Sequence, residues 1–210
     1  MGLHHCKELE GGNLLLTWKI DESLPALFEL ACLDTSEQIR YSKITSAKKQ
    51  SQWLSVRALI NTYYNEKIAL SYLEDGRPML HNQTNISISH SGDFVAILLN
   101  EKRKTGVDIQ KIAKNNIIKG KSYFINNIEL ESLPELSNRS ALHLFWSVKE
   151  ACYKWAANPH LNLKEDITIL PFMLGQSGTL RSWLSSDHHP IEALELYYEI
   201  WEDYTLACTI

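Results

Sequence analysis

Residues 86–99 read ISISHSGDFVAILL, and this stretch decides the class of fold. In its first part isoleucine alternates with serine, as in a strand that buries one face. Residues 94–99 are all apolar, as in a more deeply buried strand. Gly92 and Asp93 separate the two parts and predict a tight turn. The stretch therefore predicts a β-hairpin within an antiparallel sheet.

Further elements are expected on both sides of this hairpin. Residues 14–20 predict an apolar-rich strand, and residues 37–64 predict a helix with an apolar residue at every third or fourth position. Those apolar positions are Trp53, Val56, Ile60 and Tyr64. Residues 74–78 read EDGRP, which is typical of a turn, because glycine accepts a positive φ and proline fixes the φ that follows.

The second half of the chain continues in the same way. We expect a strand at residues 106–110, a helix at 139–157 that ends at an Asn-Pro pair, and two closing strands at 194–201 and 204–210. The order of elements predicts two units, each with a helix packed against a small sheet.

The two halves also show faint similarities in sequence. LSVR at residues 54–57 corresponds to WSVK at 146–149, a length of match that also arises by chance. Together with the element order, it suggests an internal duplication. We expect an α+β fold with two similar halves, residues 1–104 and 105–210, each an antiparallel sheet packed with helices.

Composition excludes several classes of protein. The 210 residues are 44% hydrophobic and 22% charged, which suits a folded domain and not a disordered chain. The longest purely apolar run is residues 94–99, far shorter than the roughly 20 residues that span a bilayer. The first residues show no signal-peptide pattern. We therefore expect a soluble, cytoplasmic protein with no membrane partner.

Four cysteines lie far apart and form no Cys-x-x-Cys pair. In a chain without a secretion signal this favours reduced and mostly buried thiols, and neither a disulfide framework nor a zinc finger follows. Cys152 has charged neighbours, so a catalytic thiol is an alternative there. Packing within a half-apolar helix is the simpler explanation.

Two segments of the second half carry polar side chains that could do chemistry. In the strand, Asp108 and Gln110 point to the same face. In the helix, an apolar stripe leaves Lys149, Glu150 and Lys154 along its margin. Glu150 and Lys154 are four residues apart and can be presented to one point.

This group of side chains has two interpretations. Asp108 and Glu150 would make an all-oxygen site suited to Mg²⁺, with Lys154 neutralising phosphate charge. The plain alternative is a surface salt bridge between Glu150 and Lys154.

Residues 85–91, NISISHS, place hydroxyls and an imidazole directly before a glycine. His90 could be a simple turn residue, or the segment could bind an anion. A Ser-His hydrolase built on Ser89, His90 and Ser91 is disfavoured, because adjacent side chains on a strand point apart and no Gly-x-Ser-x-Gly motif is present.

Four motifs occur in a fixed order: GRP at 76–78, ISISHS at 86–91, GVDI at 106–109 and FWSVKEACYK at 145–154. Over roughly residues 40–157 the chain resembles the 4′-phosphopantetheinyl transferases, specifically the longer Sfp type. The resemblance implies transfer of 4′-phosphopantetheine from coenzyme A to a carrier-protein serine, with release of adenosine 3′,5′-bisphosphate. It also implies two halves related by a pseudo-twofold axis, with the active site in the cleft between them.

The resemblance also implies roles for individual residues. Asp108 and Glu150 would bind Mg²⁺, or Mn²⁺, together with the coenzyme A pyrophosphate. Glu150 would be the general base, and Lys154 would hold the phosphates and stabilise the leaving group. The first half would be the nucleotide-binding side and the second half the metal and catalytic side. Further coenzyme A contacts would come from Arg40, Arg57, Gly76, Arg77, Pro78, Ser89 and His90.

One position departs from the family pattern. Gln110 stands where the family commonly has glutamate. Its amide oxygen could still ligate the metal, but it adds no negative charge, so we expect weaker metal binding with activity retained. An inactive coenzyme A or carrier-binding homologue and a metal-dependent phosphodiesterase or nuclease are the alternatives. The overall charge of −4 argues against a nucleic-acid partner.

The expected partner is an acyl or peptidyl carrier protein. Such carriers are typically acidic around the modified serine. Residues 102–121 hold seven basic side chains and one acidic side chain, and the part from Lys111 to Lys121, which includes Lys114 and Lys119, could dock an acidic helix. Tyr123 and Phe124 would extend that surface. The resemblance also implies a monomer.

Overall fold

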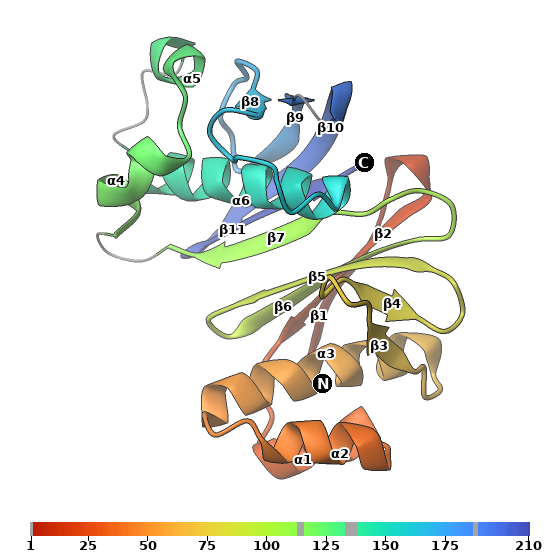
Figure 1. Cartoon of the computed structure of the whole chain (residues 1–210). Coiled ribbons are helices and arrows are strands. Elements are labelled where there is room, and N and C mark those ends of the chain that lie inside the picture. Colours follow the sequence, from red (N-terminus) through yellow and green to blue (C-terminus); the bar gives the residue numbers. More distant parts are fainter. Residues whose placement is uncertain (1, 113–115, 133–137, 187–188) are drawn as a thin grey trace. The chain divides into compact units, whose positions relative to one another are not determined.

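The computed structural model describes residues 2–112, 116–132, 138–186 and 189–210 (Figure 1). The chain divides into two compact units, Met1–Arg103 and Lys104–Ile210, called here the first and second units. Each unit has its own hydrophobic core.

The first unit is built on a four-stranded antiparallel sheet with the order β1-β2-β6-β5. These strands are β1 (Leu3–Leu9), β2 (Asn13–Lys19), β5 (Asn85–Ser91) and β6 (Phe94–Asn100). The predicted hairpin is confirmed: Ser91 pairs with Phe94, and Gly92 takes a φ of 58° in the turn. Every residue of β6 is buried, in agreement with its unbroken apolar run.

A second, two-stranded sheet surrounds the predicted turn at residues 74–78. It consists of β3 (Leu70–Tyr72) and β4 (Pro78–Leu80), which are antiparallel. Gly76 has a φ of 84°, a conformation that favours glycine over residues with a side chain. Strand β4 also contacts β5, so the turn belongs to the same unit as the hairpin.

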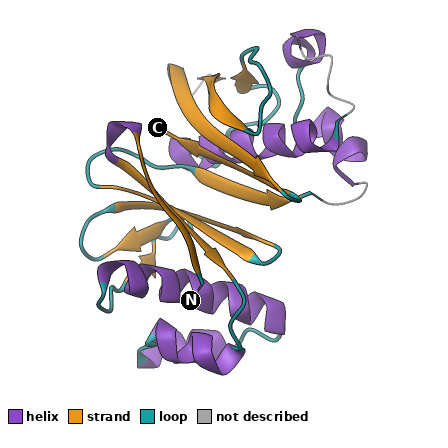
Figure 2. Cartoon of the chain, turned by 180° about the vertical axis from the view of Figure 1, so that it is seen from behind, coloured by secondary structure: helices purple, strands orange, loops and turns teal. Residues whose placement is uncertain are grey.

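Three α-helices complete the first unit: α1 (Leu24–Ala31), α2 (Thr35–Ser42) and α3 (Ala47–Tyr64). A single helix over residues 37–64 is therefore wrong. Helix α2 ends at Ser42 and α3 begins at Ala47, after Ser46, which is extended and accepts a hydrogen bond from the Lys49 amide as an N-cap. Figure 1 shows α3 between the sheet and the other two helices, and Figure 2 shows all three on one side of the sheet.

The second unit has a five-stranded antiparallel sheet with the order β7-β11-β10-β9-β8. Its strands are β7 (Val107–Lys111), β8 (Ile167–Ile169), β9 (Ser177–Ser186), β10 (His189–Trp201) and β11 (Tyr204–Thr209). The predicted strands at 106–110, 194–201 and 204–210 are confirmed. Strand β7 is an edge strand of this sheet.

The long helix of the second unit, α6 (Arg139–Ala156), packs on β7 and β11. It ends as predicted, with Ala157 in the left-handed conformation just before Asn158 and a proline. The other helices are α4 (Asn116–Gly120), the 3₁₀ turn η2 (Lys121–Tyr123) and α5 (Asn127–Ser132). The predicted α+β class, with antiparallel sheets packed by helices, is confirmed.

Across the described ranges, no helix is both long and apolar enough to cross a membrane.

Candidate functional site

The start of β7 lies directly against α6, and Gly106 makes this possible. A Cβ atom at Gly106 would lie 2.0 Å from the carbonyl oxygen of Ala151 and 2.9 Å from the Cβ of Trp155. Only a residue without a side chain fits so close to the helix backbone. The strand consequently carries Asp108 past the helix face that bears Lys154.

Lys154 joins α6 to β7 through two bonds. Its Nζ donates to Asp108 Oδ1 at 2.8 Å and to the backbone oxygen of Val107 at 2.9 Å. The Asp108 side chain is only 3% exposed and that of Lys154 is 27% exposed. This ion pair connects a strand to a helix, so it differs from the surface pair within one helix that the alternative interpretation expected.

The charges of Asp108 and Lys154 both act on the Glu150 carboxyl group. Burial raises the pKa of Glu150, and the negative charge of Asp108 raises it further, while Lys154 acts in the opposite direction. A carboxyl group with a raised pKa is better matched to proton transfer near neutral pH than an ordinary one. The arrangement of Asp108, Glu150 and Lys154 can therefore combine proton transfer with charge neutralisation.

Gln110 lies beside Asp108, on the same face of β7 as predicted. Its Nε2 donates to Asp108 Oδ2 at 2.9 Å. An ionised carboxylate only accepts hydrogen bonds, so the amide must present its nitrogen, not its oxygen, to Asp108. Both oxygens of Asp108 thus have donors, one from Lys154 and one from Gln110.

The donor set fits a hard cation such as Mg²⁺. Mg²⁺ usually takes one or two carboxylates from a protein and completes its shell with water and phosphate oxygens. Asp108 and Glu150 are two such carboxylates, and the pKa of Glu150 is raised by burial first and by the charge of Asp108 second, while Lys154 lowers it. In the described part of the chain, no cluster of three or more His, Cys, Asp or Glu side chains could hold a metal.

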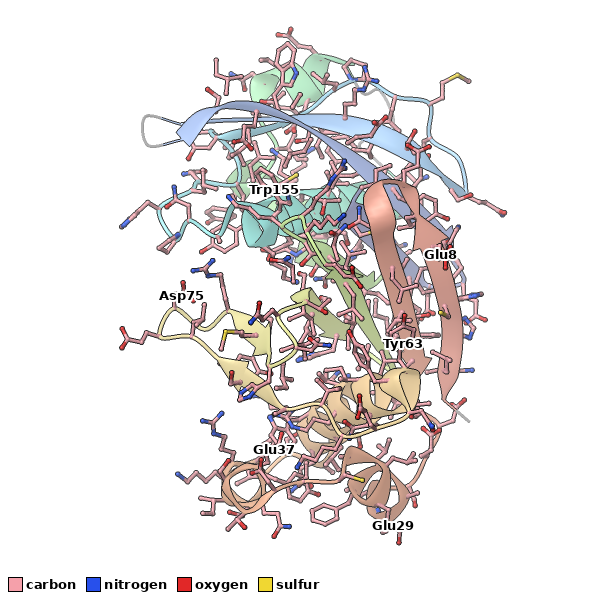
Figure 3. The ribbon with its side chains drawn as sticks, turned by 90° about the vertical axis from the view of Figure 1, so that its right-hand side faces the viewer. Glu8, Glu29, Glu37, Tyr63, Asp75 and Trp155 are labelled. Carbon is pink, nitrogen blue, oxygen red and sulfur yellow. The ribbon has the colours of Figure 1, made fainter. Side chains whose placement is uncertain are left out.

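The remaining predicted site residues lie in the first unit. Ser89 is buried on β5 and His90, the next residue, is exposed, as the alternation of a strand requires. Arg77 is exposed in the turn before β4, where its Nε bonds Asp75 Oδ2 at 2.7 Å. Figure 3 labels Asp75 at this turn. Because β4 contacts β5, the GRP and ISISHS motifs lie on neighbouring elements.

Two more residues of the GRP motif shape this turn. Gly76 has no atom within 4 Å of the position a Cβ would take, and Pro78 begins β4. The open space beside Gly76 leaves the backbone accessible for a ligand to approach.

Arg57 is buried inside the first unit and is paired with Glu37, a partner that the sequence did not predict. Its Nε bonds Glu37 Oε1 at 2.8 Å, its Nη1 donates to the backbone oxygen of Trp53, and its Cζ lies 3.2 Å from the Trp53 ring centroid. Burial lowers the pKa of Arg57, and interactions with Tyr72 and Glu37 raise it by a smaller amount. Its Nη2 has no hydrogen-bond partner among the described residues.

This arrangement ties α2 to α3. Lys67 also reaches Glu37, at 3.4 Å, so the carboxylate has two cationic partners. Figure 3 labels Glu37 on α2. Arg40 lies exposed in the last turn of the same helix. The structure thus gathers Asp108, Gln110, Glu150 and Lys154 within the second unit and holds the predicted nucleotide-side residues within the first.

The prediction that Lys149 lies at the margin of α6 is wrong. Its side chain is fully buried and pairs with Glu129 at 2.9 Å. The buried face of α6 is therefore wider than its apolar stripe, because it also includes the Lys149 side chain. Glu129 lies on α5, a short helix that no periodic pattern predicted, so nothing in the sequence indicated that Glu129 would pair with Lys149.

Several residues of the expected carrier-docking surface are exposed, and docking itself stays a prediction. Tyr123 is 81% exposed, and Lys119 and Lys121 are exposed beside it. Phe124 is 1% exposed and packs edge-to-face on Trp146 at 5.2 Å, so its proposed contact with a partner is wrong.

Two other lysines of that surface differ in what the structure says of them. Lys111 lies 3.7 Å from Asp203, and Lys114 lies outside the described residues. Apolar side chains add to the exposed part of α5, where Ile128 and Leu130 are exposed.

Comparisons with known proteins give two relatives, and no family model matches the chain. The 4′-phosphopantetheinyl transferase AcpT of Escherichia coli O157:H7 is 33% identical over 66 residues, which are 30% of this chain and 34% of the relative. The 4′-phosphopantetheinyl transferase AcpT of Salmonella typhi is 26% identical over 112 residues, which are 50% of this chain and 58% of the relative. The chain thus matches between a third and three-fifths of the length of these relatives. This weak homology supports a relationship to the phosphopantetheinyl transferase superfamily.

Proposed function

We propose that the chain is a 4′-phosphopantetheinyl transferase of the Sfp type, which moves 4′-phosphopantetheine from coenzyme A to a serine of an apo carrier protein. The observation that carries the proposal is the cluster of Asp108, Lys154 and Glu150, in which a buried carboxylate is paired with a lysine beside a carboxyl group of raised pKa. The weak similarity to two 4′-phosphopantetheinyl transferases supports the same reaction class.

The proposed reaction is a displacement at phosphorus. The carrier serine oxygen bonds to the β-phosphorus of coenzyme A while its proton passes to Glu150. The bond from that phosphorus to the bridging oxygen breaks, and adenosine 3′,5′-bisphosphate leaves with the electron pair. Lys154 stabilises the negative charge on the leaving group. Positioning and charge neutralisation are the main requirements of such transfers, and a general base typically contributes a factor of about 10²–10⁴.

We also propose that Asp108 and Glu150 hold Mg²⁺, or Mn²⁺, together with the pyrophosphate. A bound divalent cation would supply charge neutralisation on the pyrophosphate oxygens. Gln110 enters this proposal as a hydrogen-bond donor that orients Asp108, because its amide nitrogen is the atom that faces the carboxylate. A side chain without charge at this position leaves the site with two carboxylates, so metal binding is expected to be weaker than with three.

The nucleotide side of coenzyme A is assigned to the first unit. Arg77 and His90 are exposed donors on neighbouring elements, and Ser89 lies beside His90 on β5. Arg57 would contribute the charge of its buried guanidinium, whose Nη2 has no internal partner in the described part. Cationic and polar donors of this kind suit the several negative charges of coenzyme A. Weaker contributions are assigned to Arg40, Gly76 and Pro78.

The proposed partner is an acidic acyl or peptidyl carrier protein that docks on Lys119, Lys121, Tyr123 and Ile128. Reversing charge at Lys119 and Lys121 should raise the KM for the carrier roughly tenfold at low salt and leave the KM for coenzyme A unchanged. The exposed pair Lys48 and Lys49 on α3, reversed in the same way, controls for the change in net charge. Equal losses for both substrates would contradict this docking surface.

The function is tested by intact mass. Apo carrier proteins of the fatty-acid, polyketide and nonribosomal-peptide classes are incubated with coenzyme A, Mg²⁺ and the protein. We expect a gain of one phosphopantetheine, lost in Glu150→Gln and kept in Glu165→Gln, which changes an exposed glutamate of the same unit. Coenzyme A binding without transfer would identify an inactive homologue, and neither binding nor transfer would refute the proposal.

A further inference from the structure

A fully buried ion pair lies next to the proposed site. The side chains of Lys149 and Glu129 are both 0% exposed, and Lys149 Nζ lies 2.9 Å from Glu129 Oε2. The same Nζ donates to the backbone oxygens of Leu163 at 2.9 Å and Ile167 at 2.7 Å. An ammonium group has three donors, so every donor of Lys149 has a partner.

Glu129 is equally well satisfied. Its Oε2 accepts from the Asn126 amide at 2.9 Å, and its Oε1 accepts from the Ile169 amide at 2.8 Å. The Glu129 amide in turn donates to Asn126 Oδ1, which gives the reciprocal bonds of a capping box at the start of α5. The pair therefore connects three elements: α5, α6 and β8.

An apolar pair would fill the same space with less desolvation. Buried ion pairs add little net stability, and their best-attested use is to select one arrangement among several. The packing of Phe145 and Val148 in the core is not directional. Helix α6 also makes directional bonds that reach β7 or β11, through Ser147 to Thr205 and through Lys154 to Asp108 and the Val107 oxygen. The bonds of Lys149 to two backbone oxygens and one carboxylate fit a single rotation.

We propose that Glu129 and Lys149 are positioning residues that fix the rotation of α6 and thereby set where Glu150 and Lys154 present their side chains. This inference rests on the proposed function, because those two residues are its catalytic groups. Lys149 and Glu150 are consecutive, so their side chains leave the helix about 100° apart. Fixing one side chain in the core therefore fixes the direction of the other.

The test replaces the pair by apolar residues in the double variant Glu129→Leu/Lys149→Met. We expect a lower melting temperature than that of the wild type, because the variant leaves the Asn126 and Ile169 amides and the Leu163 and Ile167 oxygens without their side-chain partners. We also expect kcat to fall about tenfold or more, with a smaller rise in the KM for coenzyme A, because Glu150 is proposed to help hold its pyrophosphate. The control is Arg181→Met/Glu195→Leu, which removes an exposed pair of the same unit and should keep the wild-type kcat.

A second measurement does not depend on activity. Amide NMR signals of residues 146–154 should be single in the wild type and become doubled or broadened in the double variant, because the helix samples more than one rotation. If the double variant fails to fold, Glu129→Gln, which keeps the shape of the side chain, takes its place.

The outcomes separate the two proposals. A folded variant with the wild-type kcat and a single, unshifted set of α6 signals would overturn the positioning role. Absence of transfer by the wild type itself would overturn the proposed function instead, and the amide signals would then decide the positioning role alone.

Discussion

Substitution of Gly106 by alanine tests whether the close approach of β7 to α6 builds the site. The added Cβ would lie 2.0 Å from the Ala151 oxygen, whereas real contacts of this kind are essentially never shorter than 3.0 Å. The strand must therefore move by about 1 Å or more, because the obstacle is helix backbone and cannot rotate away. A shift of that size would lengthen the 2.8 Å bond between Lys154 and Asp108 unless the lysine follows.

The expected cost has two parts. Overpacking of this kind costs roughly 1–3 kcal/mol, which corresponds to a fall in melting temperature of about 4–8 °C for the middle of that range. A misplacement of about 1 Å at a reacting centre costs on the order of 10²-fold in rate. Thermal unfolding followed by circular dichroism measures the first, and the initial rate of carrier modification measures the second.

Gly120→Ala is the matched control, because nothing lies within 4 Å of the Cβ position at Gly120 and its φ is an ordinary −87°. It should leave both quantities unchanged. If Gly106→Ala were as stable and as active as Gly120→Ala, the site would not depend on the contact between β7 and α6, and the reasoning above would fail.

Three further substitutions address single side chains. Glu150→Gln should lower kcat by about 10²–10⁴-fold. The folded-state pKa of Glu150 is raised above 4.5, so the wild type should lose stability relative to this variant as pH rises from about 4.5 through the raised value. The variant should therefore have the larger free energy of unfolding at pH 7.5, and the difference between the two proteins should disappear at pH 4. Lys154→Met should cost roughly 1–3 kcal/mol in urea unfolding, between the limits for exposed and buried pairs, because Asp108 stays buried without its cation. Arg77→Ala should leave the stability essentially unchanged, since its pair with Asp75 is exposed, and should raise the KM for coenzyme A about tenfold.

Each of these expectations has a result that contradicts it. A stability gap for Glu150→Gln that does not vary with pH would mean that Glu150 titrates as in an unfolded chain. Full stability of Lys154→Met would show that Asp108 has other sufficient partners. An unchanged KM in Arg77→Ala would place Arg77 outside the coenzyme A site.

The sequence predicts the elements whose pattern is local. The alternation at residues 86–91, the apolar run of β6 and the helical spacing of α6 all appear in the structure, because each reflects which face of one element is buried. The pairing of Asp108 and Gln110 on one face of β7 is predicted for the same reason. Strand β1 was missed because its burial is partial and follows no clear period. Helix α1 was missed although Leu24, Leu27 and Ala31 have helical spacing, because the helix is only eight residues long.

Partners that are distant in sequence could not be predicted in this way. Arg57 is paired with Glu37 from another helix, and no periodicity indicates that bond. Lys149 has a charged side chain and is read as exposed, yet two of its three partners are backbone oxygens, which every residue carries alike. Burial of a charge depends on such partners, so it becomes visible only when the elements are assembled.

The bond from Lys154 to the Val107 oxygen has a consequence for aggregation. The Gly106 oxygen accepts from Thr209 on β11, so by the alternation of an antiparallel pair the Val107 oxygen is directed to the opposite side of β7, the outer edge of the sheet. Outer edges invite pairing with strands of other molecules, and lysines are among the groups that natural sheets use to prevent it. A side chain proposed to act on coenzyme A therefore also blocks part of this edge, and replacing it would cost solubility as well as activity.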